Sequence, residues 1–245
     1  RSVLPRTLRQ PLFGSLGKVW PKADWAPRPL RAKSTLLALS AGGEAGYARA
    51  LAILAPEQRK ALYGDTMLRE RGEYRAEQPF EETMRDAPAR SGLDRAQYAD
   101  LKFWLPGDIL TKVDRTSMAV SLEAREPLLD HHLVELAARL PETRRVSGGQ
   151  GKLALKQAME GTLPRQILYR PKQGFVLPIA QWFRSELKEA ARAAARSERL
   201  LDTGWFDAAA LSQLAEDHIA GRRDHARELW QLLMLERSVS LLSNN

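Results

Sequence analysis

Apolar residues recur at helical spacing over most of the second half of this chain, whereas the alternating pattern of a half-buried strand is nearly absent from the whole sequence. Over residues 224–242 the pattern is apolar on almost every side, at Leu229, Trp230, Leu232, Leu233 and Leu235. A helix of this kind lies inside a larger structure. The sequence therefore predicts a mostly α fold.

Capping signals indicate where several helices begin. We expect Asp108 to cap a helix that runs to about Ser121, Asp130 to cap the next one, and Asp207 to open a helix that Gly221 ends. The expected core stripe of the helix after Asp130 is Leu133, Leu136, Ala137 and Leu140.

Prolines and glycines divide the remaining chain into shorter helices. Residues 1–33 are rich in Pro, Arg and Trp, and prolines at this density break helices. Helices are expected within 34–54, 56–63 and 68–89. Pro178 fits the first turn of a helix that buries Phe183 among other apolar residues.

Two glycine strings look like nucleotide-binding loops but lack essential residues. Gly151-Lys152 resembles the end of a P-loop, yet Val146 and Leu153 stand where that loop needs Gly and Ser or Thr. We interpret it as a turn that starts a helix, and residues 41–47 as a glycine-interrupted helix boundary.

Composition limits the classes of function. The chain has 245 residues and no cysteine, so disulfides, thiolate metal sites and a cysteine nucleophile are excluded within it. Its four histidines show no metal-ligand spacing, and we predict no metal site. No apolar run is long enough to span a bilayer and no signal peptide is recognisable, which favours a cytoplasmic location. The chain does not begin with Met, which indicates that Arg1 is not its natural start.

The net charge of +8 has two interpretations. One is a polyanionic partner, either nucleic acid or the phosphates of a nucleotide. The other is an Arg-rich surface interleaved with Glu and Asp. We favour the second, because the basic residues form no continuous stripe and no nucleic-acid motif accompanies them.

Charged residues gather between residues 105 and 130. Asp108, Lys112 and Arg115 fall at i, i+4 and i+7, on one face of the expected helix. By spacing alone this is a surface helix with an Asp108–Lys112 pair that contributes a few tenths of a kcal/mol. Glu123 and Arg125 follow in the turn before Asp130.

As a whole, this segment resembles the asparagine synthase (glutamine-hydrolysing) family. The family pattern is K-V-D-R-x-S-M followed by E-x-R-x-P-F-L-D, and here residues 112–118 read KVDRTSM and residues 123–130 read EAREPLLD. A second block, G-K-x-x-L-K, L-P and R-x-K-x-G-F, is matched within residues 151–175. The resemblance is strong over 95–240, weaker over 1–95, and closest to amidotransferase-like members associated with exosortase and exopolysaccharide gene sets.

The resemblance implies a fold, a reaction and its partners. Residues 96–245 would be the helical C-terminal part of an α/β, adenine-nucleotide α-hydrolase-like (ATP pyrophosphatase) synthetase domain, and residues 1–95 a helical, Pro/Arg-rich connecting region. The family uses ATP with Mg²⁺ to adenylate the carboxylate of aspartate, releases pyrophosphate, and forms an amide with ammonia made from glutamine in a separate N-terminal glutaminase domain. A homodimer is an open possibility.

The resemblance also implies roles for individual residues. Lys172 matches the lysine that the family places on the pyrophosphate, and Lys112 lies where a basic residue faces the ATP phosphates. Arg125 contacts substrate or pairs with Glu123 or Asp130, and both alternatives stay open. Arg115, Asp108 and Glu123 are assigned with it to substrate or ATP binding.

Three departures from the family pattern leave other functions open. Glu126 replaces the usual Val, and neither the S-G-G-x-D-S pyrophosphatase loop nor the N-terminal glutaminase cysteine is present in these residues. We therefore expect the chain to be inactive alone. The alternatives are a non-catalytic helical scaffold and a basic nucleic-acid-binding helical protein. The acceptor is aspartate or another carboxylate.

Overall fold

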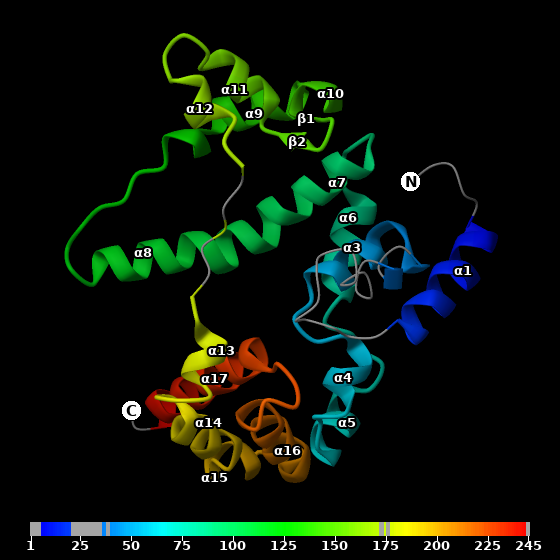
Figure 1. Cartoon of the computed structure of the whole chain (residues 1–245), viewed down its shortest axis with the longest axis vertical. Coiled ribbons are helices and arrows are strands. Elements are labelled where there is room, and N and C mark those ends of the chain that lie inside the picture. The colour runs from blue at the N-terminus through cyan, green and yellow to red at the C-terminus, as the bar shows by residue number, and fades with distance from the viewer. Residues whose placement is uncertain (1–5, 21–35, 38–39, 172–173, 175–176, 244–245) are drawn as a thin grey trace. The chain divides into compact units, whose positions relative to one another are not determined.

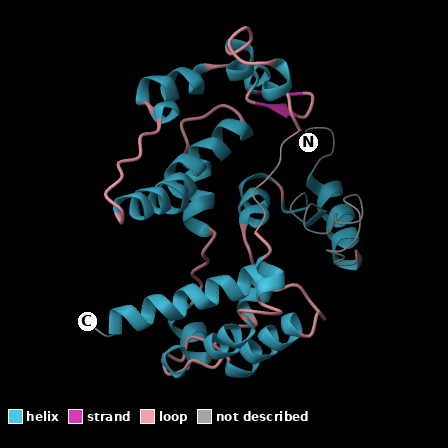
Figure 2. Ribbon diagram, turned by 60° about the vertical axis from the view of Figure 1, so that its left-hand side comes forward, coloured by secondary structure: helices cyan, strands magenta, loops and turns pink. Residues whose placement is uncertain are grey.

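The computed structural model describes residues 6–20, 36–37, 40–171, 174 and 177–243. These residues are mostly helical, which confirms the predicted fold class (Figures 1 and 2). The chain divides into two compact units: unit 1 comprises residues 1–81 and 176–245, and unit 2 comprises residues 82–175. Unit 2 is thus an insertion in unit 1. The predicted boundary at residue 95, between the connecting region and the C-terminal part of the synthetase domain, stays a prediction.

A closed hydrophobic core lies at the C-terminal end of unit 1. Its helices are α13 (Ile179–Trp182), α14 (Lys188–Ala195), α15 (Glu198–Leu201), α16 (Ala208–Ile219) and α17 (Ala226–Ser243). Helix α14 packs against α16 and α17, and α13 and α15 also pack against α17. Phe183, Ala191 and Leu200 are fully buried there.

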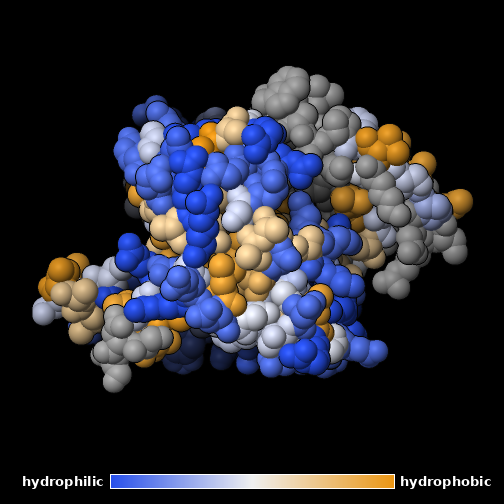
Figure 3. Space-filling model, turned by 90° about the horizontal axis from the view of Figure 1, so that it is seen from below, coloured by the Kyte–Doolittle hydropathy of each residue, from blue (hydrophilic) through white to orange (hydrophobic). Residues whose placement is uncertain are grey.

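The face drawn in Figure 3 is largely hydrophilic with small groups of hydrophobic residues.

Local signals set the ends of these helices as predicted. The Asp207 carboxylate accepts a hydrogen bond of 2.7 Å from the Ala210 N–H, which caps α16. Gly221 follows α16 with φ of 71°, a conformation that costs glycine little. Pro178 directly precedes α13. Helix α17 buries Leu229, but Trp230 on the same helix is 38% exposed, so the helix is less enclosed than its sequence predicts.

The N-terminal part of unit 1 contains α1 (Arg6–Val19), α3 (Gly43–Leu51), α4 (Pro56–Lys60) and α5 (Asp65–Arg71), and α6 (Gln78–Asp86) crosses into unit 2. Gly42 precedes α3 with φ of 66°, which confirms the predicted helix boundary. The charged stretch from Leu68 forms two helices, because Gly72 at φ of 54° ends α5.

Backbone hydrogen bonds join the two sequence segments of unit 1. The Gly64 N–H donates to the Trp205 carbonyl at 2.9 Å, and the Asp207 N–H donates to the Leu62 carbonyl at 3.0 Å. A Cβ on Gly64 would lie 2.5 Å from the Gly204 carbonyl oxygen, so only glycine permits this close approach. The α4–α5 and α15–α16 connections are therefore held together.

A buried histidine links three parts of the core. His218 is fully buried, and its Nε2–H donates to the Ala180 carbonyl at 3.0 Å. The His225 N–H donates to His218 Nδ1 at 3.0 Å. One nitrogen donates and the other accepts, so this pattern assigns the neutral imidazole. Burial lowers the pKa of His218 below its ordinary value of 6.5.

This pKa shift predicts a loss of stability in acid. The unfolded chain takes up the proton that folded His218 resists, so the free energy of unfolding is greatest above pH 6.5 and falls as the pH drops from 6.5 toward the lower folded-state pKa. The slope is at most about 1.4 kcal/mol per pH unit for one proton. Urea titrations across this pH range measure the free energy of unfolding. We expect its pH dependence to lose the contribution of His218 in His218→Gln and to keep it in His131→Gln, because His131 is exposed. An unchanged pH profile in His218→Gln would contradict the assignment.

Unit 2 is built from short helices around one long helical segment. The long segment comprises α7 (Gly92–Ala99), the π-helix η2 (Asp100–Leu110) and α8 (Thr111–Met118). After it come the 3-10 turn η3 (Pro127–Leu129), α9 (His131–Arg139), α10 (Glu142–Arg145), the strands β1 (Val146–Ser147) and β2 (Gln150–Gly151), α11 (Leu153–Ala158) and α12 (Arg165–Leu168). The two strands form an antiparallel hairpin.

Candidate functional site

The long helical segment of unit 2 carries the first group of predicted site residues. It begins at Gly92, where the Ser91 hydroxyl accepts a hydrogen bond of 3.0 Å from the Asp94 N–H. Asp108 therefore lies inside the helical segment, and its prediction as an N-cap was wrong. Pro106 and Gly107 look like a helix stop in the sequence, but the segment passes through them in the wider turns of η2.

The predicted charged pair is present on this segment. Lys112 Nζ lies 3.4 Å from Asp108 Oδ1, and both side chains are more than half exposed. Arg115 is 82% exposed and its Nε lies 4.0 Å from Asp114 Oδ2. Exposed pairs of this kind contribute at most a few tenths of a kcal/mol. A contribution to the stability of the fold therefore does not explain why these charged residues are present.

An extended segment follows α8. Ser121 adopts a positive φ of 58°, after which residues 122–126 form neither helix nor strand. Arg125 Nη2 donates to Glu123 Oε1 at 3.0 Å, and both side chains are exposed. Of the alternatives for Arg125, the structure shows the pair with Glu123. This exposed pair leaves the guanidinium accessible to a substrate.

Asp130 acts as the predicted cap. Its carboxylate accepts hydrogen bonds from the N–H groups of His132 and Leu133, at 3.0 and 3.3 Å, and so begins α9. The predicted core stripe of α9 was wrong for these residues: Leu133 and Leu136 are 39% and 58% exposed. Helical spacing predicts which side chains share a face, but burial depends on what packs against that face.

The glycine string at 148–152 is a hairpin turn followed by a helix start. Gly148 and Gly149 have φ of 58° and 75°, and positive φ at both central residues is typical of the tight turns that suit two-residue hairpins. Lys152 at φ of 60° then precedes α11. The interpretation as a turn that starts a helix is confirmed.

A partly buried ion pair holds this hairpin region to α7. Arg145 donates to the carboxylate of Asp94 and, at 2.5 Å, to Gln97 Oε1. The Arg145 side chain is only 12% exposed. Its hydrogen bond lowers the pKa of the Asp94 carboxyl below its ordinary value. The pair therefore joins the segment between the two resemblance blocks to the helix that precedes the first block.

Cations also surround Tyr169 in the second block. Lys156 Nζ lies 5.2 Å and the Arg165 guanidinium 4.8 Å from the centre of the Tyr169 ring. The Tyr169 hydroxyl donates to Glu160 Oε1 at 2.5 Å, which raises the pKa of the phenol. Lys172 follows three residues later and lies outside the described residues, so its role stays a prediction.

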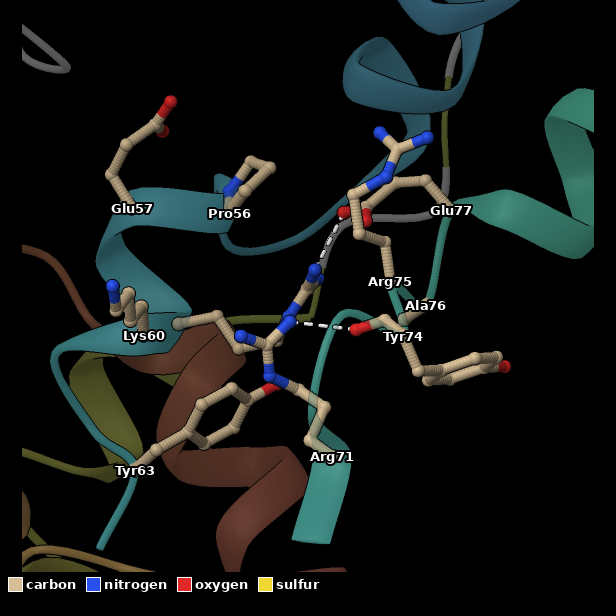
Figure 4. Close-up of a pocket in the computed structure, with 10 residues that line it drawn as sticks. Pro56, Glu57, Lys60, Tyr63, Arg71, Tyr74, Arg75, Ala76 and Glu77 are labelled. Carbon is tan, nitrogen blue, oxygen red and sulfur yellow. Dashed lines mark hydrogen bonds and ion pairs between the residues drawn. The ribbon is translucent and has the colours of Figure 1, made fainter. Parts of the chain in front are cut away.

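Unit 1 contains a pocket that the sequence did not indicate. Its volume is about 200 Å³, and Arg59, Tyr63, Arg71, Tyr74 and Glu77 are among its lining residues (Figure 4). None of the described site residues predicted from the sequence lines it.

The charges of this pocket are largely paired within the protein. Arg59 donates to Glu77 at 2.7 Å and Arg71 donates to the Tyr74 carbonyl at 2.6 Å. Burial is the largest single influence on Glu77 and would raise its pKa, but the hydrogen bond from Arg59 and the positive charges of Arg59 and Arg75 together outweigh it, and the pKa is lowered.

The structure shows two further features that bear on function. No helix of the described residues has the length and apolar character to cross a bilayer. Within the same residues, no group of three or more His, Asp or Glu side chains is placed to hold a metal ion.

Comparisons with known proteins agree with the motifs in these blocks. The family model "Asparagine synthase" matches residues 11–240. A putative glutamine-hydrolysing asparagine synthetase of Mycobacterium bovis is 41% identical over 141 residues, which cover 57% of this chain and 21% of that protein. Glutamine-hydrolysing asparagine synthetase 1 of Bacillus subtilis is 34% identical over 149 residues, or 61% and 23%.

Similarity extends to mammals. The glutamine-hydrolysing asparagine synthetase of Bos taurus is 32% identical over 142 residues, which cover 50% of this chain and 24% of the relative. The chain thus spans about a fifth to a quarter of the length of these relatives. No solved structure matches it. Because the family model matches nearly the whole sequence, the chain belongs to the asparagine synthase family.

Proposed function

We propose that the complete protein containing this chain is an ATP-dependent amidotransferase of the asparagine synthetase type. It adenylates a carboxylate and releases pyrophosphate, and ammonia derived from glutamine then displaces AMP to form the amide. The match of the family model across residues 11–240, which include both blocks of unit 2, carries this proposal. The relatives bear the name of glutamine-hydrolysing asparagine synthetases.

The proposed chemistry requires fixed positive charge. Adenylation transfers AMP to the carboxylate and breaks the bond between the α- and β-phosphates, so pyrophosphate leaves with its negative charge. Preorganised cations stabilise the charge that develops on such a leaving group. Lys172 and Lys112 supply these charges in our proposal, and Arg125 and Arg115 contact ATP or the acceptor.

Each of the two carboxylates among the proposed site residues pairs with one of the cations. Asp108 pairs with Lys112, and Glu123 pairs with Arg125. Each acid limits the conformations of a long basic side chain, which reduces the entropy lost when a phosphate binds. Asp108 and Glu123 therefore position the cations in this proposal.

Magnesium would enter with ATP. In our proposal the metal is held by the phosphates and largely by residues outside this chain. When bound, Mg²⁺ neutralises phosphate charge. The acceptor is aspartate or another carboxylate. The glutaminase and pyrophosphatase-loop regions belong to the same protein, which we propose to be cytoplasmic. This chain without those regions is catalytically inactive in our proposal.

Exchange of label between ATP and pyrophosphate tests this function in the complete protein. We expect exchange that depends on added aspartate or another carboxylate. A protein that binds ATP but shows no exchange with any carboxylate tested would support the non-catalytic scaffold. Steeply salt-dependent binding to arbitrary duplex DNA would instead support the nucleic-acid alternative that the net charge of +8 allows.

Lys112→Ala separates a functional role from a structural one. The Asp108–Lys112 pair is exposed, so we expect the free energy of unfolding to change by less than about 0.5 kcal/mol. Exchange is expected to slow about tenfold or more, because a phosphate-facing charge is lost. Lys102→Ala is the matched control, since it removes an exposed cation from the same helical segment. Equal exchange in the two variants would remove Lys112 from the site.

A further inference from the structure

Within the part of the chain that the structure describes, the pocket of unit 1 contains two buried polar atoms without a hydrogen-bond partner. They are Nε of Arg71 and Oε2 of Glu77, and both residues line the pocket. Buried polar atoms in folded proteins are nearly always paired. An unpaired donor and an unpaired acceptor in one pocket are therefore evidence for a ligand that pairs with both.

Glu77 is a buried carboxylate with one oxygen unused. Its side chain is only 9% exposed, and its Oε1 accepts a hydrogen bond of 2.7 Å from Arg59 Nη2. A buried charge is costly unless it is paired, and the Arg59 pair accounts for its presence there. The pair does not involve Oε2, which still lacks a hydrogen-bond donor.

Arg71 is a cation whose charge is not neutralised by a described carboxylate. Its Nη1 donates to the Tyr74 carbonyl at 2.6 Å, and its guanidinium lies 5.9 Å from the centre of the Tyr63 ring. These two contacts orient the guanidinium, but neither of them supplies a negative charge. The planar fork of donors on Arg71 therefore suits an anionic partner.

The two groups enter the pocket from different elements. Arg71 is the last residue of α5, Glu77 directly precedes α6, and Gly72 at φ of 54° turns the chain between them. In Figure 4 both charged groups point toward the middle of the pocket. Pro56 and Ala76 add apolar wall to the same space. A complementary ligand has an acidic end, a hydrogen-bond-donating end and an apolar part.

We propose that this pocket binds a free α-amino acid with an apolar side chain, whose carboxylate pairs with Arg71 and whose ammonium group donates to Glu77. The pocket volume of about 200 Å³ is below the range of about 300–1,000 Å³ that is usual for drug-sized ligands, and so suits a small molecule. This binding is separate from the proposed ATP chemistry and does not depend on it.

Simpler occupants satisfy only part of the pocket. A water molecule can bond both unpaired atoms, but it leaves the charge of Arg71 without a counter-charge. An inorganic anion neutralises Arg71, but the Glu77 carboxylate repels it and gains no donor from it. A zwitterion places opposite charges against both residues, which is why we favour an amino acid.

Calorimetric titration of the complete protein tests the ligand. The probes are L-leucine and L-phenylalanine, each compared with its amide, which lacks the carboxylate, and with its N-acetyl form, which lacks the ammonium group. We expect at least one of the two free amino acids to bind, and its amide and N-acetyl forms to bind at least about tenfold more weakly. Each derivative loses a hydrogen bond between charged groups in a buried pocket.

Substitutions assign each end of the ligand to one residue. We expect Arg71→Met to abolish the preference for the free acid over its amide, and Glu77→Gln to abolish the preference for the free amine over its N-acetyl form. Arg69→Met and Glu73→Gln are the matched controls, because both residues are exposed, lie close in sequence, and do not line the pocket. Both controls should keep both preferences.

Three results would count against the proposal. Absence of binding by either amino acid at millimolar concentration would overturn it and leave water as the occupant. Equal binding of the free amino acid, the amide and the N-acetyl form would also overturn it. Loss of both preferences in the control variants would remove Arg71 and Glu77 from the site. The comparison of the three ligand forms uses the unsubstituted protein, so a variant that fails to fold does not affect it.

Discussion

Phe183→Ala is expected to lower the free energy of unfolding of unit 1 by about 3–5 kcal/mol. Phe183 has no exposed surface. Its ring meets His218 edge to face at 6.2 Å and Trp230 at 6.5 Å, which connects the end of α13 with α16 and α17. Removing the ring forfeits its burial and leaves a cavity among helices that relax only in part.

Urea unfolding of the complete protein, followed by hydrogen exchange of the α17 amides, measures this loss where it occurs. Leu241→Ala is the control, since Leu241 lies on α17 and is 69% exposed. This control is expected to cost far less. A loss below about 1 kcal/mol for Phe183→Ala would show that this core is not closed as described.

Lys172→Ala is expected to slow ATP–pyrophosphate exchange in the complete protein by about 10²–10³-fold, the usual effect of losing one preorganised stabilising group. The expectation follows from the resemblance of residues 169–175 to the family block, in which a lysine contacts the pyrophosphate. The rate constant of exchange at saturating ATP should fall more than the apparent affinity for ATP, because the charge on the leaving group is greatest in the transition state.

Lys172→Arg keeps the charge but changes its geometry, and we expect it to restore part of the rate. Lys102→Ala is again the cation-removing control. The thermal stability of all three variants should match the unsubstituted protein within a few degrees. Exchange near the unsubstituted rate in Lys172→Ala would discredit the assignment, whatever the result for Lys112.

Local chemistry made part of this fold predictable. Asp130 and Asp207 cap helices as their sequence positions indicate, because a cap depends on a few adjacent residues. Gly42 and the Gly148–Gly149 turn were predictable for the same reason. The Asp108–Lys112 pair follows from i, i+4 spacing. In the site, spacing thus predicts one pair, and only the resemblance points to Lys172.

Long-range contacts were not predictable. Nothing near His218 in the sequence indicates that its ring bonds the Ala180 carbonyl, or that Arg145 pairs with Asp94. Asp108 was predicted as a cap, but the sequence gives no sign that a π-helix continues through Pro106. Burial of the α9 stripe depends on whether another surface packs against it, and helical periodicity carries no information about that surface.

The insertion of unit 2 within unit 1 has a consequence for folding kinetics. The Asp207 N–H reaches the Leu62 carbonyl only when the chain has closed a loop that contains all of unit 2. Contacts of such high sequence separation form late and slow the search for the native state. The entropy of closure grows only with the logarithm of loop length, by about 0.6 kcal/mol for each doubling. Unit 2 can therefore lengthen or shorten in evolution with little thermodynamic effect on its host.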